Sequence, residues 1–347
     1  MAEIYPAEQF SCQPPVNLEA DDDAAKFINS PIPHFYELVH RAEPVTLSIL
    51  NNINIATPHG LMFEAARHLI AESYHNASMV EIPLREVTSI LANGVVSAPA
   101  TASVEAPALL ALGPWSWVYH HWLLEILPRL WVLDEFPEFS DIPIIVPGDM
   151  TGFQTDSLTA LGIKEDQLLP FDGSNWQFDR LIVPSFLAPC GHSRRQIQWL
   201  RKKLFSSFDI EQNETGKRRL YISRQDATRR RLLNEDDIEN YLHNLGFETV
   251  LPGELSLKDQ LLLFNEAEMI CGTSGSGMTN HVFAPPQASL IEMQPDSYIN
   301  RAHWFSSNAC GQSYAFAIGS SESDHHDYHL PLEKLESALK SLLHDGF

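Results

Sequence analysis

The fold of this chain is decided between residues 220 and 295, which read LYISRQDATRRRLLNEDDIENYLHNLGFETVLPGELSLKDQLLLFNEAEMICGTSGSGMTNHVFAPPQASLIEMQP. The pattern predicts strand, basic loop, helix, strand, helix, strand, Gly/Ser loop, helix and strand. Strands that alternate with helices of this length are typical of a parallel sheet with helices on both faces. Such sheets bind ligands at the carboxyl ends of their strands.

Individual residues predict where the helices of this stretch begin and end. Asn234 is the expected N-cap of a helix with an acidic first turn, and Gly246 ends that helix. Ser256 is the expected cap of the following helix, which runs to about residue 267. The apolar stripe of the first helix consists of Ile238, Tyr241, Leu242 and Leu245.

Two loops at strand ends carry residues suited to an anion. The first runs from Ser223-Arg224 to Arg229-Arg230-Arg231, and guanidinium groups bind phosphate oxygens bidentately. Arg229 and Arg230 are expected to be solvated residues of a basic loop. Arg224 directly follows the predicted strand and Arg231 lies just before the helix cap, so these two are the candidate phosphate-binding residues. The second loop is Gly272–Gly277, whose glycines permit close approach and whose following helix presents N–H groups.

The spacing of the second loop matches neither a dinucleotide-binding GxGxxG nor a GxxxxGK[ST] phosphate loop. It also differs from the GxSxG nucleophile elbow, so a tight turn that only packs the helix is the structural alternative. Together the two loops predict a site for a phosphorylated ligand such as a nucleotide diphosphate. Glu292 ends the next strand and is a candidate acceptor for ribose hydroxyls.

Composition limits the class of protein. The 347 residues suit two α/β domains, predicted as 1–205 and 206–347, with a β-rich preface at about 40–110 that includes Val95-Val96. The net charge of −22 argues against a nucleic-acid partner. The N-terminus shows no signal-peptide pattern and no run reaches the roughly 18 apolar residues of a membrane span, which predicts a cytoplasmic protein. Four dispersed cysteines without CxxC spacing argue against a disulfide or zinc framework.

The first half contains one further candidate site. Residues 119–131 have helical periodicity, with a kink expected at Pro128. His121 and Glu125 are spaced i, i+4 and share a face of that helix, which suits general base catalysis on an alcohol. A core histidine at the edge of an amphipathic helix is the structural alternative. Residues 21–23 and the Asp/His segment 324–329 are interpreted as solvated, and no metal site is predicted.

These residues together resemble glycosyltransferase family 61, and within it the bacterial capsular-polysaccharide-type members. The likeness covers roughly residues 115–295 in three blocks. The blocks are His121-Trp122-Leu123-Leu124-Glu125 with Leu127-Pro128-Arg129-Leu130; Tyr221-Ile222-Ser223-Arg224 with Arg231, Asn234 and Glu235; and Gly272 to Asn280 with Phe283 and Ile291-Glu292.

The resemblance implies a GT-B architecture, with two Rossmann-like domains facing a cleft and a last helix that can pack back on the first domain. It implies an inverting, metal-independent transfer from a UDP-type nucleotide sugar to a hydroxyl of a glycan or polysaccharide. Glu125 would be the general base, with His121 positioning the acceptor or substituting as base. The donor-binding residues would be Arg224, Arg231, Asn234, Ser274, Gly275, Ser276, Gly277, Asn280 and Glu292.

One departure from the family pattern keeps alternatives open. Ser274 stands where the family typically has a histidine, and a hydroxyl cannot carry a positive charge. A non-catalytic nucleotide-sugar or glycan-binding protein on the same fold is one alternative. A serine hydrolase using Ser274 or Ser276 is another, with His281 or His303 as its base. Peripheral association with the inner face of a membrane is compatible with the expected acceptors.

Overall fold

The computed structural model describes residues 2–19, 22–31, 36–64, 68–70, 73, 99–185 and 192–343. The chain divides into two compact units, and each is described by itself. The first consists of Met1–Glu8 and Arg41–Leu204, and the second of Gln9–His40 and Phe205–Phe347. The predicted single break after residue 205 is therefore wrong for residues 9–40, which belong with the second unit.

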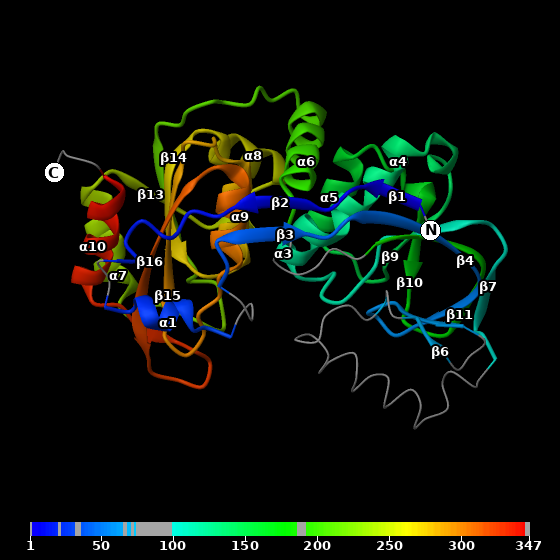
Figure 1. Cartoon of the computed structure of the whole chain (residues 1–347), viewed down its shortest axis with the longest axis horizontal. Coiled ribbons are helices and arrows are strands. Elements are labelled where there is room, and N and C mark those ends of the chain that lie inside the picture. The colour runs from blue at the N-terminus through cyan, green and yellow to red at the C-terminus, as the bar shows by residue number, and fades with distance from the viewer. Residues whose placement is uncertain are drawn as a thin grey trace. The chain divides into compact units, whose positions relative to one another are not determined.

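The first unit is built on a mixed sheet with the strand order β10-β9-β8-β11-β4-β5-β6 (Figure 1). In addition, β1 pairs with β4 and β7 pairs with β11. The strands are β1 (Ala2–Tyr5), β4 (Val45–Ala56), β5 (Leu61–Glu64), β6 (His68–Leu69), β7 (Ala102–Val104), β8 (Ala108–Leu110), β9 (Ile144–Pro147), β10 (Leu168–Phe171) and β11 (Trp176–Pro184).

The strands predicted as a β-rich preface are part of this sheet. Strand β4 pairs antiparallel with β11 along the run from Ile55↔Trp176 to Leu47↔Pro184. Strands β8, β9 and β10 follow in parallel. The preface therefore supplies strands β4 to β8 of a sheet whose other strands are β1 and, from residues 144–184, β9, β10 and β11. The expected run Val95-Val96 lies outside the described residues.

The predicted helix over residues 119–131 forms three short helical segments. They are α3 (Tyr119–His121), the π-helix η4 (Trp122–Ile126) and the 3₁₀-helix η5 (Leu127–Trp131). Pro128 has no N–H group to continue the preceding ladder, and it occupies the first turn of η5. The other helices of this unit are α4 (Val132–Glu135), η6 (Pro137–Phe139), α5 (Gly152–Ala160), η7 (Glu165–Gln167) and α6 (Arg194–Ser207), whose end passes into the second unit.

The second unit contains the sheet predicted from residues 220–295. Its order is β13-β12-β14-β15-β16-β17, with every pair parallel except the antiparallel pair of β16 and β17. The strands are β12 (Arg218–Ile222), β13 (Phe247–Val250), β14 (Ala267–Thr273), β15 (Ser289–Pro295), β16 (Ser313–Ser321) and β17 (Tyr328–His329). Strands β2 (Glu8–Ser11) and β3 (Val39–Ala42) form a separate small sheet.

Helices cover both faces of the second sheet, as the sequence predicts. In Figure 1, α7 and α10 lie on one side of the strands and α8 and α9 on the other. The helices are α1 (Ala24–Ile28), α7 (Glu235–Asn244), η8 (Pro252–Glu254), α8 (Leu257–Asn265), η9 (Ser276–Phe283), α9 (Ala302–Cys310) and α10 (Leu332–Leu342). The Ser256 hydroxyl accepts from the Asp259 N–H at 3.2 Å, which confirms the predicted cap of α8.

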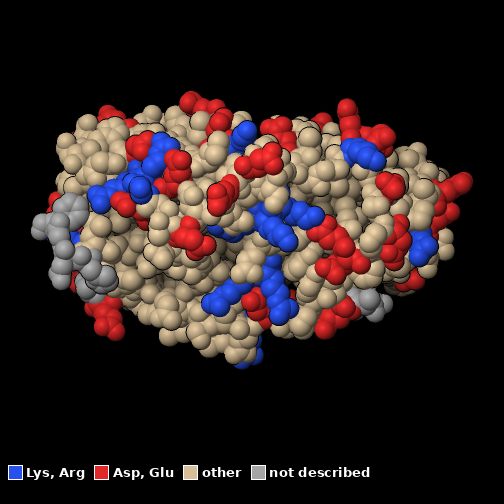
Figure 2. All heavy atoms as spheres, turned by 90° about the horizontal axis from the view of Figure 1, so that it is seen from above, with Lys and Arg blue, Asp and Glu red and all other residues tan. Residues whose placement is uncertain are grey.

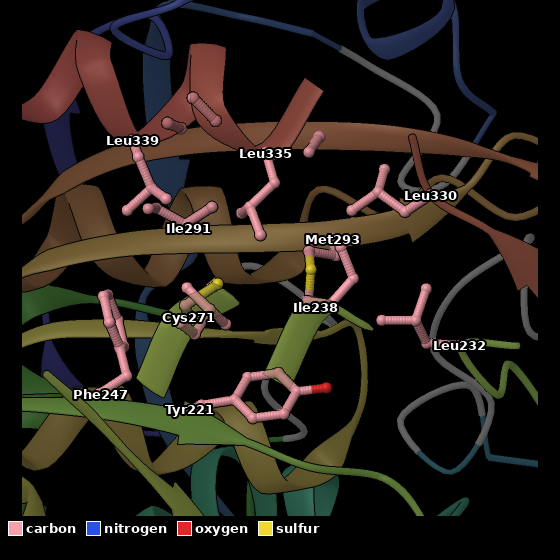
Figure 3. Packing of buried hydrophobic residues seen from close by; sticks show 14 of the residues in the cluster. Tyr221, Leu232, Ile238, Phe247, Cys271, Ile291, Met293, Leu330, Leu335 and Leu339 are labelled. Carbon is pink, nitrogen blue, oxygen red and sulfur yellow. The ribbon is translucent and has the colours of Figure 1, made fainter. Parts of the chain in front are cut away.

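The core on the α7 and α10 side shows why these helices have apolar stripes. Ile238 of α7 and Leu335 and Leu339 of α10 are buried against the sheet, where Ile291 and Met293 of β15 face them (Figure 3). Helix α10 packs on β15 and β16 of its own unit. That the last helix also packs back on the first domain stays a prediction.

Residues 9–40 are held to the second unit by buried polar and aromatic contacts. The Arg301 guanidinium donates to the carbonyl oxygens of Phe27 at 2.9 Å, Ile28 at 2.6 Å and Ser30 at 2.9 Å. The ring of Phe27 stacks on Phe316 of β16, with centroids 4.5 Å apart. These contacts anchor the segment to β16 and to the start of α9.

The acidic run at residues 21–23 is not uniformly solvated. Asp23 is buried and forms ion pairs with Lys26 at 2.8 Å and with Lys334 of α10. Asp22 is exposed, and Asp21 lies outside the described residues. The correction follows from tertiary contact, because Lys334 is far away in sequence.

Acidic side chains are scattered over the face shown in Figure 2, and Lys and Arg gather in smaller groups between them. This distribution agrees with the net charge of −22. None of the helices within the described residues has the length and apolar character needed to cross a lipid bilayer.

The buried arginine that precedes α9 leads to a stability prediction. Arg301→Met should lower the free energy of unfolding by about 3 kcal/mol, because buried carbonyl oxygens of residues 27–30 lose their donor. Arg218→Met is the matched control, since Arg218 makes half-exposed ion pairs with Glu248 and Glu266 and should cost less than about 1 kcal/mol. Urea unfolding measures both, and equal losses would contradict the role given to Arg301.

Candidate functional site

The strand order of the second sheet creates a topological switch point between β12 and β14. Counted along the chain, the parallel strands lie in the order 2-1-3-4-5. Ile222 at the end of β12 is paired with Gly272 near the end of β14. The loops that begin at Ser223 and Ser274 therefore leave the sheet side by side, at the point where open α/β sheets bind ligands.

Arg224 packs directly against the glycine loop. A Cβ atom on Gly275 would lie 1.8 Å from Arg224 Nη1, so a side chain at this position would displace the guanidinium. Gly272 is similarly confined, because its Cβ would lie 2.6 Å from Met278 Sδ and 2.8 Å from Ile222 Cβ. The two predicted anion-binding loops thus meet, and glycine is required at both positions for close approach.

The Arg224 guanidinium is a half-buried cation whose hydrogen bonds within the protein are incomplete. Its Nη2 donates to the backbone oxygen of Arg229 at 3.2 Å, while its buried Nε has no partner among the described residues. No described carboxylate oxygen lies within 4.0 Å of its nitrogens. Burial, together with the nearby charge of Arg230, lowers the pKa of Arg224. A cation in this situation is stabilised by a bound anion.

Glu235 holds the start of the arginine loop. Its Oε1 accepts from the Tyr221 hydroxyl at 2.8 Å, from Ser223 Oγ at 2.7 Å and from the Arg224 N–H at 3.4 Å. This buried carboxylate ties the end of β12 to the first residue of α7. The sequence indicated only an acidic residue in a helical first turn, because the hydroxyl partners belong to the preceding strand.

Arg230 adds a second cation that the sequence analysis interpreted as solvated. It has a left-handed backbone with φ 55°, and its backbone N–H donates to the His325 oxygen at 2.9 Å. Its guanidinium carbon lies 4.7 Å from the centre of the Tyr298 ring. The sequence contains no signal for this position, because Tyr298 and His325 come from distant segments.

Two residues predicted to bind the donor, Arg231 and Asn234, form hydrogen bonds with Asp327 and Leu330 respectively. Arg231 Nη2 and Nε donate to Asp327 Oδ2 at 2.8 Å and 3.2 Å, and its backbone N–H donates to Oδ1 at 2.9 Å. Asn234 donates from Nδ2 to the Leu330 oxygen at 2.9 Å and accepts from the Leu330 N–H at 3.1 Å. Asn234 thus holds the N-cap position of α7 without capping it. Asp327 is buried, so the solvated interpretation of segment 324–329 is wrong at this residue.

Glu292 and Asn280 are buried and bonded within the protein. Glu292 Oε1 lies 2.6 Å from His303 Nδ1, and Oε2 accepts from the Tyr314 hydroxyl at 2.7 Å. A ribose could reach this carboxylate only by displacing these groups, and the predicted ribose contact stays a prediction. Asn280 Nδ2 donates to Gln260 Oε1 of α8 at 2.7 Å, which is a packing contact between helices.

The remaining predicted donor-binding residues lie at the glycine loop itself. Ser274 is buried, and its N–H donates to the Met293 oxygen of β15 at 2.9 Å. Ser276 and Gly277 are half-buried and begin η9, for which Gly275 is the N-cap. The predicted helix after the loop is thus confirmed as the 3₁₀-helix η9, whose N-terminal end, with its unpaired N–H groups, follows the loop that leaves the switch point.

The two histidines considered for a serine hydrolase, His281 and His303, form hydrogen bonds with residues outside the glycine loop. His281 Nδ1 lies 2.7 Å from Gln312 Oε1, and its Nε2 lies 2.8 Å from Ser306 Oγ. His303 is bonded to Glu292. Neither ring is directed at a serine of the glycine loop, so the structure does not favour the hydrolase alternative.

The first unit holds the other predicted catalytic residues. His121 ends α3, and Glu125 lies in the π-helix η4, a turn type that is frequent at functional sites. His121 Nδ1 lies 2.8 Å from Glu125 Oε1, as the i, i+4 spacing predicts. The His121 side chain is 19% exposed and that of Glu125 is 6% exposed. The carboxylate therefore orients the ring, and the imidazole is the more accessible group.

His120 and His192 complete a cluster around Glu125 that the sequence analysis did not predict. One ligand atom from each of the three residues lies within 4.8 Å of the other two, and this is the one such group of three among the described residues. The rings of His120 and His192 meet edge to face with centroids 5.5 Å apart. His192 precedes α6, far from His120 in sequence, so no ligand spacing could have revealed the cluster.

A family model and a known protein each match part of this chain. The model of a family described as Glycosyltransferase 61 matches residues 119–291, just under half of the chain. The match spans both His121–Glu125 and the glycine loop. An alpha-1,3-arabinosyltransferase of Oryza sativa subsp. japonica is 36% identical over 83 residues. The aligned segment is 23% of this chain and only 14% of that relative's length.

The buried Asp327 leads to a prediction on pH dependence. The hydrogen bonds from Arg231 hold the pKa of Asp327 below its usual value, so the pair stabilises the fold fully above about pH 4. That contribution is lost as the pH falls through the depressed pKa. Asp327→Asn should therefore lower the free energy of unfolding at pH 7, and the difference from wild type should shrink in acid. Denaturant unfolding at several pH values measures it, and a difference independent of pH would contradict the assignment.

Proposed function

We propose that this chain, which both matches support as a glycosyltransferase of family 61, transfers a sugar from a UDP-type nucleotide sugar to a hydroxyl of a glycan or polysaccharide. The proposed transfer inverts the anomeric carbon and requires no essential metal. The proposal combines the anion site of the second unit with the histidine–glutamate pair of the first.

The observation that carries this proposal is the state of Arg224. Its half-buried guanidinium, with Nε lacking a partner among the described residues, lies against Gly275 at the switch point of a parallel sheet. Arg230 adds positive charge nearby. These groups suit the diphosphate of a nucleotide sugar, and two guanidinium groups can neutralise a leaving diphosphate in the place of a metal ion.

The reaction proceeds in one displacement. The acceptor oxygen forms a bond to the anomeric carbon while the bond from that carbon to the diphosphate oxygen breaks. The electron pair of the broken bond leaves with the diphosphate, beside Arg224. The proton of the acceptor hydroxyl passes to the catalytic base. Attack from the face opposite the leaving group inverts the anomeric centre.

His121 suits the role of base better than Glu125 does. Its Nδ1 is held by Glu125 at 2.8 Å, which leaves Nε2 to accept a proton, and its side chain is the more exposed of the two. Glu125 then orients the imidazole and stabilises the imidazolium that forms. The first assignment of these roles from the sequence is thereby reversed, while both residues stay in the proposed catalytic pair.

We further propose a GT-B arrangement, in which the second unit binds the donor and the first unit presents the acceptor. Ser274 takes the place of the histidine typical of the family, and Arg230, whose charge acts on Arg224, supplies positive charge that this serine lacks. A capsular-type polysaccharide made at the cytoplasmic face of a membrane is the proposed setting. It rests on the resemblance alone.

Nucleotide binding tests the anion site. Arg224→Gln should weaken UDP binding by about 10- to 100-fold, since a hydrogen bond to a charged group contributes about 1.5–3 kcal/mol. Arg229→Gln is the matched control, because this exposed arginine of the same loop contacts Arg224 only through its backbone oxygen. Calorimetric titration with UDP, GDP and CMP, with and without EDTA, measures the affinities. Equal loss in both variants, or no binding of any nucleotide to wild type, would overturn the site.

Turnover tests the catalytic pair. Glu125→Gln should retain nucleotide binding and reduce kcat by about 10²–10⁴-fold, because the neutral amide cannot stabilise an imidazolium. Transfer and donor hydrolysis are measured with the nucleotide sugar that binds best. Normal turnover by the variant would exclude the role of Glu125. Tight nucleotide binding by a wild-type protein that never turns over would instead favour a nucleotide-sugar-binding protein.

A further inference from the structure

We propose that His120, Glu125 and His192 bind a Zn²⁺ ion, and that the bound ion inhibits the enzyme. One ligand atom from each residue already lies within 4.8 Å of the others. Ligand atoms around tetrahedral zinc are separated by about 3.4 Å, given metal–ligand distances of about 2.0–2.1 Å. Side-chain shifts of about 1 Å therefore complete three positions of the tetrahedron.

The donor set is chemically suited to zinc. Two imidazole nitrogens and one carboxylate oxygen form the ligand combination found in open zinc sites, where water takes the fourth position. Imidazole favours zinc and its late transition-metal neighbours over magnesium or calcium, which prefer oxygen donors. Mg²⁺ should consequently not compete for this cluster.

The local structure holds the three ligands with little freedom. Glu125 and His192 are buried, and the edge-to-face contact fixes the ring of His120 against that of His192. His121 Nδ1 contacts Glu125 Oε1 from its side of the carboxylate. A hydrogen bond of this kind to a ligating carboxylate orients the ligand, as outer partners do in metal sites.

The inhibitory effect rests on the proposed function. Binding of zinc requires the Glu125 carboxylate to shift toward the two histidine ligands. Because the same carboxylate lies 2.8 Å from His121 Nδ1 and holds its ring, the shift displaces the imidazole from the position in which it would meet the acceptor. Zinc should thus lower transfer without affecting nucleotide binding at Arg224.

Zinc titration of the full chain, first stripped with EDTA and then dialysed free of it, tests the site. A chromophoric zinc indicator serves as competitor. Wild type should bind one ion tightly, and His192→Gln and His120→Gln should each weaken that ion by at least about tenfold. The control is the double variant His325→Gln/His329→Gln, which removes two exposed histidines of the Asp/His segment 324–329 and should leave the tight site unchanged. Thermal unfolding without zinc verifies that each variant is folded.

The outcomes of the titration are separate from those of the activity assay. The zinc site would be overturned if wild type bound no zinc tightly, or if His120→Gln and His192→Gln both bound zinc as tightly as wild type. Loss of tight zinc binding in the His325→Gln/His329→Gln control would also overturn the zinc site, because the Asp/His segment 324–329 would then supply the ligands.

Transfer activity tests the inhibition, expressed for each protein relative to the same protein without zinc. One equivalent of zinc should strongly reduce the transfer activity of wild type and should reduce that of His192→Gln much less. Undiminished transfer by zinc-loaded wild type would refute the inhibition. If wild type shows no transfer with any nucleotide sugar, the proposed function fails, and the titration alone decides the zinc site.

Discussion

The parallel pairing of β12 with β14 is the constraint on which the candidate donor site depends. It sets the end of one strand beside the end of another that lies about fifty residues later, and it makes their junction the switch point of the sheet. Arg224 and Gly275 can meet only because of this pairing, and the absence of a Cβ atom at Gly275 gives the guanidinium its space.

Buried polar contacts around this junction divide the charged residues into two kinds. Arg231, Asp327 and Glu235 satisfy one another or their neighbours, and Arg301 satisfies the carbonyl oxygens of residues 27–30. Arg224 differs from them, because within the described residues its half-buried guanidinium makes a single hydrogen bond, to the backbone oxygen of Arg229. A buried cation is costly unless an anion accompanies it. A phosphorylated ligand is the counterpart that the proposed function assigns to Arg224.

The chemistry proposed for the first unit depends on a different feature, the π-helical turn of η4. The turn lies between α3 and Pro128 and carries Glu125, within hydrogen-bond distance of His121. Folding then brings His120 and His192 to the same carboxylate. A carboxylate that two more imidazoles surround is also a potential metal ligand, so one arrangement underlies both the proposed orientation of the base and its proposed inhibition by zinc.

The sequence by itself determined the parallel sheet of the second unit, the helices on its two faces, the contact of His121 with Glu125, and the two loops at strand ends. These features are encoded locally, in apolar periodicity, helix caps and i, i+4 spacing. Only the tertiary structure decided which charged side chains remain available. Arg231, Asn234 and Glu292 are bonded to partners from distant segments, residues 9–40 join the second unit, and His192 reaches Glu125. Burial and long-range pairing depend on the whole packed chain, and local patterns contain no record of them.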